Sequence, residues 1–497
     1  MDYQSISNQL SGEMSEGNQS QAFYIGFRLT IQKTGGWLPP PLILFTYKIM
    51  KKSLVCLLSL ISLLGSCDGF LDEKPQKQMV IPSTLDDFQA LLDSEPRSMN
   101  SVPKMGFLST DDLVLSNTLL NQVTLDESAP YLWQSDMYLP SDAGVDWAFS
   151  YRKVFYANLV IEGVRDFTPN TAEENKRAIE LDAAARFYRA FAHFSLVQEF
   201  APPFDPDSPQ GMGIPIRKDA DINADSERVT IGEVYNFILE DLEIARNVLP
   251  EKPDIPTRAS KWAAEALLSR IYLSIQNYGK AMEHASHALD IGNTLLDYNE
   301  LDPGLRYSFP RFHAEVIHHA HMFSGRYNPN TQTFVNPELY SMYDSLDLRK
   351  SAYFRPASTA GMYNVIGKYS GEPAIYGGMA TDEVVLDFVE SAARLGMEDA
   401  ALEELNRLLK NRYQSGSFVP VEGKSGKELI RLIIDERRKE LVFRGIRWLD
   451  LRRLNQDPEY AITLDRKWNG LEIVIEPNSS AYTFPIPPRE LELNDML

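Results

Sequence analysis

The segment PTRASKWAAEALLSRIYLSIQNYGKAMEHASHALDIG, residues 256–292, decides the fold, because its side chains recur with the spacing of two packed helices. The first helix carries bulky residues at its packing positions, and the second carries small ones: Leu268, Tyr272, Tyr278, Ala281, Ala285 and Ala288. Small side chains let one helix lie close against another. This is the pattern of a tetratricopeptide repeat, and it predicts a helix pair here.

A looser copy and two earlier helical segments extend this prediction along the chain. Residues 383–412 repeat the pattern with Gly396 at the turn, and residues 150–164 and 178–200 are periodic over lengths typical of long helices. A single repeat cannot bury its apolar face, so we expect a stack of about four helix pairs. The predicted fold is mainly α and tetratricopeptide-like.

Two parts of the chain depart from helical periodicity. Residues 293–382 are rich in Tyr, Gly and Pro and include the strand-like AEVIHHAHM, so we predict a loop-rich insertion that offers a binding surface. Near the C-terminus, residues 470–491 alternate about the turn PNSS at 477–480, which predicts a small β-hairpin.

The order of basic and then apolar residues from Met50 predicts a secretory signal. Lys51 and Lys52 precede an apolar run that ends at Gly65, too short for a stable transmembrane span. The string LGSC that ends at Cys67 resembles a bacterial lipobox, in which the thiol receives a lipid anchor. A core helix is the alternative interpretation. We expect residues 50–66 to be removed.

Residues 1–49 stand before this signal and contain no periodic core pattern. A signal has to emerge first from the ribosome, so we expect translation to begin at Met50 and residues 1–49 to be an upstream extension. Cys67 would then be the first residue of the working protein.

Composition excludes several classes of partner. With 49 basic and 69 acidic residues the chain has a net charge of −20, which argues against binding to nucleic acid or anionic lipid. The only cysteines are Cys56, inside the signal, and Cys67. After cleavage neither an intramolecular disulfide nor a cysteine-based metal site is possible.

Arg437 lies on the apolar stripe of the predicted helix 428–445. An arginine in that position requires a carboxylate partner. We predict a structural ion pair with Glu436 or Glu440 on the same helix, or with a carboxylate elsewhere. A ligand-binding role for Arg437 is the alternative.

Two further patterns suggest metal binding but fall short of a site. His319 and His321 share one face of a strand, a spacing compatible with a metal, but no third ligand is evident. The stretch DPDSPQG at 205–211 resembles a calcium loop with its Gly one place late and no following Glu. We therefore predict no metal or other cofactor.

Six motifs in order resemble the SusD/RagB family of outer-membrane nutrient-binding lipoproteins. They are FLDEKP (70–75), YANLVI (156–161), AAARFYRAFAHFSLVQEF (183–200), PTRASKWAAEALLSRIYL (256–273), ERRKELVFRGIRWLDLRRL (436–454) and FPIPPRELELN (484–494). The chain departs from the family pattern at FAPPFD (200–205), where relatives have a YGDVP-like turn.

The resemblance implies one SusD-like helical domain over residues 67–497. Its N-terminal part would be residues 67–260, and its C-terminal part would be residues 261–497, with the insertion at about 293–382. It implies a non-enzymatic protein that captures a glycan, or in some relatives a peptide, and passes it to a SusC-like TonB-dependent β-barrel transporter. The expected location is the outer membrane, lipid-anchored and facing the extracellular side, in keeping with acidic residues such as Asp68 after Cys67.

Sugar rings pack on aromatic faces and their hydroxyls need polar partners, so aromatic and polar residues in loops are the candidate ligand residues. The candidates come from a loop-like aromatic stretch and from the insertion: Tyr131, Trp133, Asp136, Tyr138, Tyr327 and Tyr376. Trp133 is the first choice. Two other classes stay open: a helical glycoside hydrolase, which needs two carboxylates across a cleft, and a protein-binding repeat scaffold.

Overall fold

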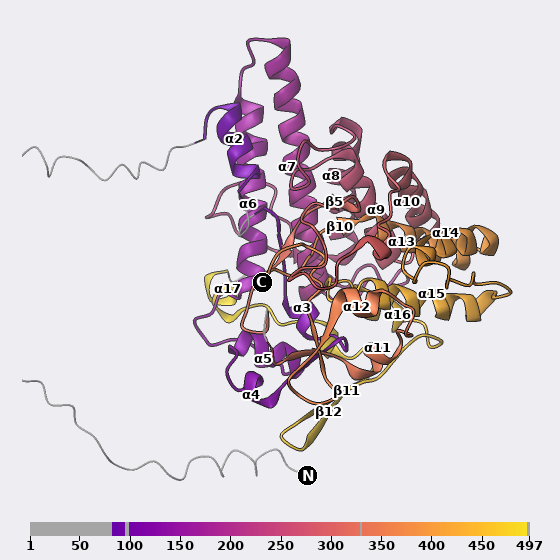
Figure 1. The fold of residues 1–497 in the computed structure, drawn as a ribbon. Coiled ribbons are helices and arrows are strands. Elements are labelled where there is room, and N and C mark those ends of the chain that lie inside the picture. Colours follow the sequence, from indigo (N-terminus) through magenta and orange to yellow (C-terminus); the bar gives the residue numbers. More distant parts are fainter. Residues whose placement is uncertain (1–81, 95–98, 329–330, 495–497) are drawn as a thin grey trace, which may run out of the picture. The chain divides into compact units, whose positions relative to one another are not determined.

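The computed structural model describes residues 82–94, 99–328 and 331–494, which belong to one unit, Ile81–Leu497 (Figure 1). The predicted extension 1–49, the signal 50–66 and the lipidation site Cys67 lie outside the described residues. Within these three ranges, every helix is too short or too polar to cross a membrane.

Helices are the main regular elements of the described structure, as the sequence predicted. Eight of them follow one another as neighbours in a stack, in which each packs against the next: α6 (Val145–Asp166), α7 (Ala172–Phe200), α8 (Ile231–Val248), α9 (Lys261–Ser274), α10 (Tyr278–Ile291), α13 (Thr381–Arg394), α14 (Glu398–Lys410) and α15 (Gly426–Glu440). Figure 1 shows α6 and α7 side by side and the later helices following in chain order. The stack corresponds to four helix pairs, as expected.

The central pair α9 and α10 is stabilised by a helix cap and by the small buried side chains that its sequence predicted. Ser260 caps α9 by accepting a hydrogen bond from the amide of Ala263. Ala281 and Ala285 are fully buried, and Leu268 opposite them is buried too. In the second pair, Gly396 has φ +78 at the turn between α13 and α14, a conformation that glycine adopts without strain.

The remaining helices are short. They are α2 (Leu85–Leu92), α3 (Met105–Leu108), α4 (Asn117–Leu120), α5 (Leu125–Tyr131), α11 (Pro337–Ser341), α12 (Arg349–Tyr353), α16 (Arg447–Leu454), α17 (Pro488–Leu493) and the 3-10 turns η1 (Tyr298–Glu300) and η2 (Ser480–Tyr482).

The strands are short and pair two by two. The parallel pair is β1 (Ser101–Val102) with β6 (His321–Met322), and the antiparallel pairs are β2 (Leu113–Leu115) with β7 (Thr333–Val335), β3 (Met212–Pro215) with β4 (Arg228–Thr230), β5 (Val316–His318) with β10 (Met379–Ala380), β8 (Phe354–Pro356) with β9 (Tyr363–Val365), and β11 (Leu464–Trp468) with β12 (Leu471–Ile475). Two of these pairs, β1–β6 and β2–β7, join the insertion to the N-terminal segment.

The C-terminal hairpin exists, but its turn is not where the sequence placed it. The chain reverses at Asn469 and Gly470, both with positive φ, between β11 and β12. An Asn-Gly pair is the preferred turn for a two-residue hairpin loop. The predicted turn at 477–480 instead follows β12, so the alternating residues form only the second strand of the hairpin.

Candidate functional site

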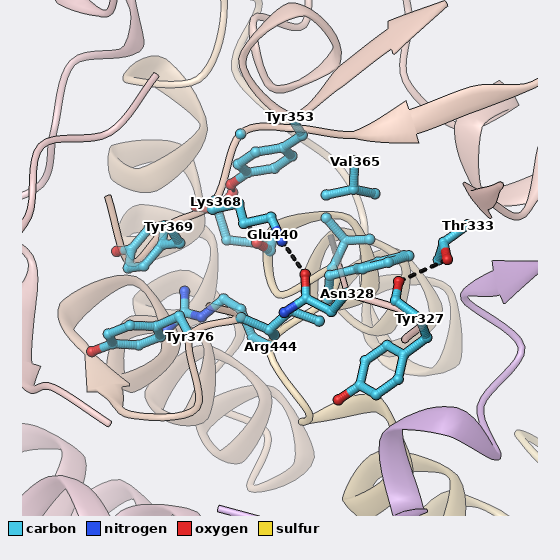
Figure 2. A pocket seen from close by; sticks show the side chains of 14 residues that line it. Tyr327, Asn328, Thr333, Tyr353, Val365, Lys368, Tyr369, Tyr376, Glu440 and Arg444 are labelled. Atoms are coloured by element: carbon cyan, nitrogen blue, oxygen red, sulfur yellow. Dashed lines mark hydrogen bonds between the residues drawn. The ribbon is translucent and has the colours of Figure 1, made fainter. Parts of the chain in front are cut away.

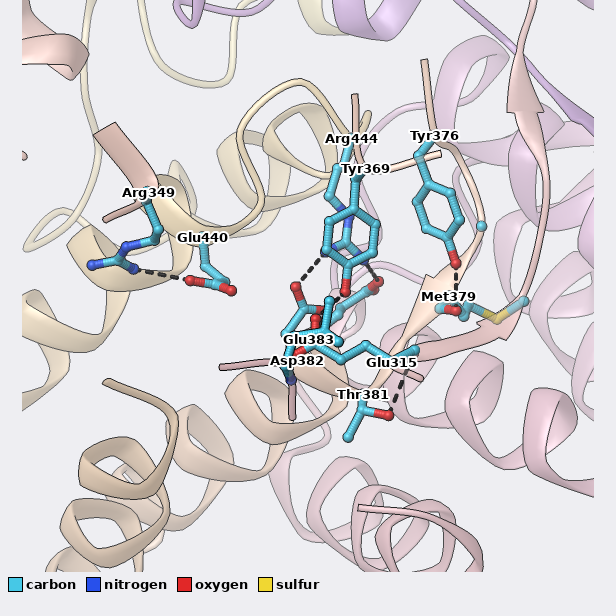
Figure 3. Close-up of polar contacts among 12 residues, drawn as sticks. Glu315, Arg349, Tyr369, Tyr376, Met379, Thr381, Asp382, Glu383, Glu440 and Arg444 are labelled. Carbon is cyan, nitrogen blue, oxygen red and sulfur yellow. Dashed lines mark hydrogen bonds and ion pairs between the residues drawn. The ribbon is translucent and has the colours of Figure 1, made fainter. Parts of the chain in front are cut away.

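A buried network of arginines and carboxylates joins the insertion to α15. Arg412 donates to Glu440 at 2.7 Å and to Glu315 at 2.8 Å. Arg349 donates to the other oxygen of Glu440 at 3.0 Å (Figure 3). All four side chains are almost completely buried. Charges that leave water must be paired, so this network fixes the insertion to the helical stack.

The partners predicted for Arg437 on its own helix are wrong. Arg437 contacts Asp387 at 2.7 Å and Asp450 at 3.0 Å. Its partners are therefore carboxylates elsewhere in the chain, which was the alternative prediction. Neighbouring residues on a helix do not face each other, so Glu436 points away from Arg437. Glu436 and Glu440 both pair with Arg349 instead, and Glu440 also pairs with Arg412.

A cavity of about 40 Å³ lies where the insertion meets the turn after α15 (Figure 2). The ammonium group of Lys368 contacts the side-chain oxygen of Asn328 and donates to the carbonyl of Pro373 at 2.7 Å. Burial lowers the pKa of Lys368 to about 8. One water molecule needs about 10–15 Å³ of such space, so the cavity has room for only a few waters and is small for a sugar ring.

Tyr327 and Tyr376, predicted from the sequence as ligand residues, both line this cavity (Figure 2). Each is 1% exposed, and their hydroxyls donate to the carbonyls of Phe323 at 2.6 Å and Met379 at 2.7 Å. Their rings therefore belong to the core and offer no face to a ligand in this conformation.

The aromatic stretch after α5 is also largely enclosed. Tyr131 is buried, and its hydroxyl accepts from the amide of Leu115 at 3.1 Å. Trp133 is half-buried: its indole donates to the carbonyl of Ser109 at 2.9 Å, and the Arg466 guanidinium lies 4.4 Å from its ring. Trp133 also has φ +52, which bulky residues rarely adopt.

The two remaining predicted residues are more accessible. Asp136 is exposed. Tyr138 is half-buried and its hydroxyl donates to the Met105 sulfur at 3.6 Å, while burial raises its pKa. Trp133, Asp136 and Tyr138 thus keep part of their surface in contact with solvent.

A larger groove, with a volume of about 610 Å³, lies beside the first half of α6. That volume is typical of ligand sites. Its walls come from α6, the loop after β3 and α17: Trp147, Tyr151, Arg152, Phe155, Pro215, Arg217, Asp219, Ile222, Asn223, Ala224, Asp225, Ser226, Glu490, Leu493 and Asn494. We call it the α6 groove.

Packed aromatic residues form one wall of the α6 groove. The ring of Trp147 packs edge-on against Phe200, with 5.0 Å between the ring centroids. The centroid of the Trp147 ring lies 4.8 Å from that of Tyr151. The Tyr151 hydroxyl donates to the carbonyl of Pro215 at 2.8 Å, which holds the opposite loop in place. Tyr151 and Phe155 are half-buried and keep part of each ring available.

The α6 groove also contains charged side chains without a protein partner among the described residues. The side chains of Arg152, Asp225 and Glu490 form no hydrogen bond or ion pair with any residue in the described ranges. Arg152 is exposed, and its guanidinium lies 4.2 Å from the centroid of the Phe149 ring. Such groups can bond to the hydroxyls or charges of a ligand without first breaking an internal contact.

Next to the groove, two buried carboxyl groups face each other at the base of α3. Asp146 accepts from the amides of Lys104 at 2.9 Å and Met105 at 2.7 Å, and Glu199 accepts from Gly106 at 2.9 Å. Burial, partly offset by Lys104, raises the pKa of Asp146 to about 6. Burial and the neighbouring Asp146 raise the pKa of Glu199.

In fold and site, the chain is a tetratricopeptide-like helical protein with a groove of ligand size. A sequence profile described as "Starch-binding associating with outer membrane" matches residues 69–273, and one described as "SusD family" matches residues 379–497. The chain belongs to the SusD/RagB family, whose members are binding proteins rather than enzymes.

Similar proteins agree in fold. The "SusD-like protein P2" of Formosa agariphila is 26% identical over 90% of this chain and 99% of its own length. The crystal structure of a SusD superfamily protein from Bacteroides thetaiotaomicron has a TM-score of 0.68 at 21% identity, covering 83% of this chain and 98% of its own. A SusD-like carbohydrate binding protein from Bacteroides vulgatus has a TM-score of 0.63 at 18% identity, with 84% and 97% covered.

Sequence reasoning missed the α6 groove, because none of the six predicted ligand residues lines it. Tyr151 and Phe155 are four residues apart and so lie on one face of α6, which is a signal that helical spacing could have given. The third wall, α17, lies more than 330 residues further along the chain, and local pattern cannot place it.

Proposed function

We propose that this protein captures a glycan at the cell surface in the α6 groove and delivers it to a TonB-dependent outer-membrane transporter. The observation that carries the proposal is the pairing of aromatic surface with uncommitted charged groups in one groove of about 610 Å³. Half-buried Tyr151 and Phe155 would pack on the apolar faces of sugar rings. Arg152, Asp225 and Glu490 would bond to the hydroxyls.

Membership of the SusD/RagB family supports a binding role, since its members bind glycans and work with SusC-like transporters. Delivery to such a transporter and attachment by Cys67 to the outer leaflet form part of the proposal. The acidic charge of −20 favours a neutral or cationic ligand over a polyanionic one.

Isothermal calorimetry tests the proposal on the chain from Asp68 to Leu497, after a glycan array has identified a ligand. We expect Phe155→Ala to weaken binding about 2- to 13-fold, because an aromatic contact contributes roughly 0.5–1.5 kcal/mol. Arg152→Ala is expected to weaken binding as well. Arg306→Ala is the matched control, because Arg306 is also exposed beside an aromatic ring, that of Tyr307, but lies outside the groove.

Three results would overturn the proposal. If Trp133→Ala abolishes binding while Phe155→Ala and Arg152→Ala leave it unchanged, the glycan binds at Trp133 and not in the α6 groove. Release of reducing sugar from the bound glycan would replace the binding role with hydrolysis. Binding of peptides but of no glycan would favour the peptide-binding alternative.

A further inference from the structure

His319, His321 and Glu372 converge on one point at the edge of the insertion. The Nε2 atom of His321 lies 2.9 Å from Nε2 of His319 and 2.7 Å from Oε2 of Glu372. Nε2 of His319 lies 3.5 Å from the same carboxylate oxygen. Three atoms with lone pairs therefore lie within 3.5 Å of one another.

Hydrogen bonding alone accounts poorly for this cluster. Each neutral imidazole nitrogen carries either one proton or one lone pair, and an ionised carboxylate only accepts. A single proton on Nε2 of His321 serves the contact to Glu372 or the contact to His319 well, but not both. A cation at the centre accepts a lone pair from all three atoms at once.

We propose that His319, His321 and Glu372 bind a divalent transition-metal ion of the zinc type. Imidazole nitrogens favour such ions over Mg²⁺ and Ca²⁺, and two histidines with one glutamate form a known zinc ligand set with one position left for water. Zinc–nitrogen distances of about 2.0–2.1 Å place tetrahedral ligands about 3.3 Å apart, so only shifts of a few tenths of an ångström are needed.

The surrounding structure holds the three ligands in place. The amide of His319 donates to the carbonyl of Pro256 at 2.7 Å, and the amide of His321 donates to the backbone carbonyl of Asn100 at 2.9 Å. Arg311 contacts the other oxygen of Glu372 at 3.2 Å, as outer partners of metal-binding carboxylates do. The Glu372 side chain is 28% exposed, which gives an ion access from solvent, whereas His319 is fully buried.

The proposed ion would join two segments that are 51 residues apart. Glu372 belongs to the loop that also carries Lys368, Tyr369 and Tyr376 of the cavity in Figure 2. An ion bound to the native state alone stabilises it by mass action. The site therefore extends beyond the proposed glycan role, because it would order this loop whether or not a glycan is bound.

The test is titration of Zn²⁺ into tag-free, chelator-stripped protein from Asp68 to Leu497, followed by calorimetry. We expect one ion per chain, and we expect Glu372→Gln and His321→Asn each to lose at least about 100-fold in affinity. Hydrogen exchange in residues 366–376 should slow when Zn²⁺ is added. Circular dichroism verifies that each variant is folded, and the partial exposure of Glu372 makes Glu372→Gln the safer of the two.

A second cluster in the same chain supplies the matched control. Glu265, His284 and His287 also gather, with His284 at 2.7 Å and His287 at 3.5 Å from one Glu265 oxygen. A proton on Nδ1 of each histidine satisfies these contacts, because a carboxylate oxygen can accept from both, so no cation is needed and His287→Asn should leave zinc affinity unchanged. The proposal fails if the unaltered protein binds no zinc, if Glu372→Gln binds it as tightly, or if His287→Asn removes the binding.

Discussion

Replacing Arg412 by methionine should destabilise the protein strongly, because Arg412 connects three segments of the fold. Its guanidinium donates to Glu440 at the end of α15, to Glu315 in the insertion and to the carbonyl of Leu296, at 2.7, 2.8 and 2.7 Å. Methionine fills much of the same space but provides no donor. Both carboxylates would then stay buried with fewer partners.

The expected cost follows from these contacts. Three hydrogen bonds to a charged group, at about 1.5–3 kcal/mol each, set an upper range of roughly 4.5–9 kcal/mol. Glu440 keeps Arg349, and Glu315 keeps the hydroxyl of Tyr369, so part of that range is retained. Breaking one partner of a buried ion pair costs about 3–5 kcal/mol, and we expect about 4 kcal/mol here.

Differential scanning calorimetry checks this value. With an unfolding entropy of about 2.1 cal/mol/K per residue over roughly 400 ordered residues, a loss of about 4 kcal/mol lowers the melting temperature by about 5 °C. Arg431→Met is the control, because the pair of Arg431 with Glu459 is exposed and should contribute little. Equal melting temperatures for Arg412→Met and the unaltered protein would refute the reasoning, as would an equal fall in the control.

Two further predictions concern pH and location. Asp146 has a folded-state pKa raised from 3.8 to about 6, so its contribution to stability is complete below about pH 4 and is lost as the pH rises through about 6. Glu199→Gln removes the neighbouring acid and should flatten this fall in melting temperature between pH 4 and 8; parallel curves for the two proteins would contradict it. Cys67→Ala should move the protein from the membrane to the soluble fraction and abolish labelling by palmitate, because acyl chains hold a protein at about 0.8 kcal/mol per buried CH₂. A variant that stays with the membrane would show that another segment anchors it.

The helical stack was predictable because its signals are local. Alanines four residues apart, as at Ala281 and Ala285, mark the face of a helix that packs closely against a neighbour, and this pattern is visible in the sequence alone. The same holds for Gly396, whose place between two apolar periods marks a turn. The family motifs likewise lie within single helices or turns.

The binding residues were less predictable, because the sequence around an aromatic residue in a loop does not show whether distant segments bury its side chain. Trp133 lies beneath Arg466, and Tyr376 lies in the core, through contacts between segments more than 50 residues apart. The β1–β6 and β2–β7 pairs involve strands of two or three residues, which are too short to show a period of two.

The sequence by itself determined the class of the fold, the family and the helix faces that meet, since these depend on spacing within one turn or one helix. Only the tertiary structure decided which carboxylates pair with Arg437, which residues line the α6 groove and that Glu372 joins His319 and His321. The physical reason is the same in each case. Charges, grooves and metal ligands depend on contacts between distant segments, and the positions of those segments follow from packing of the whole core.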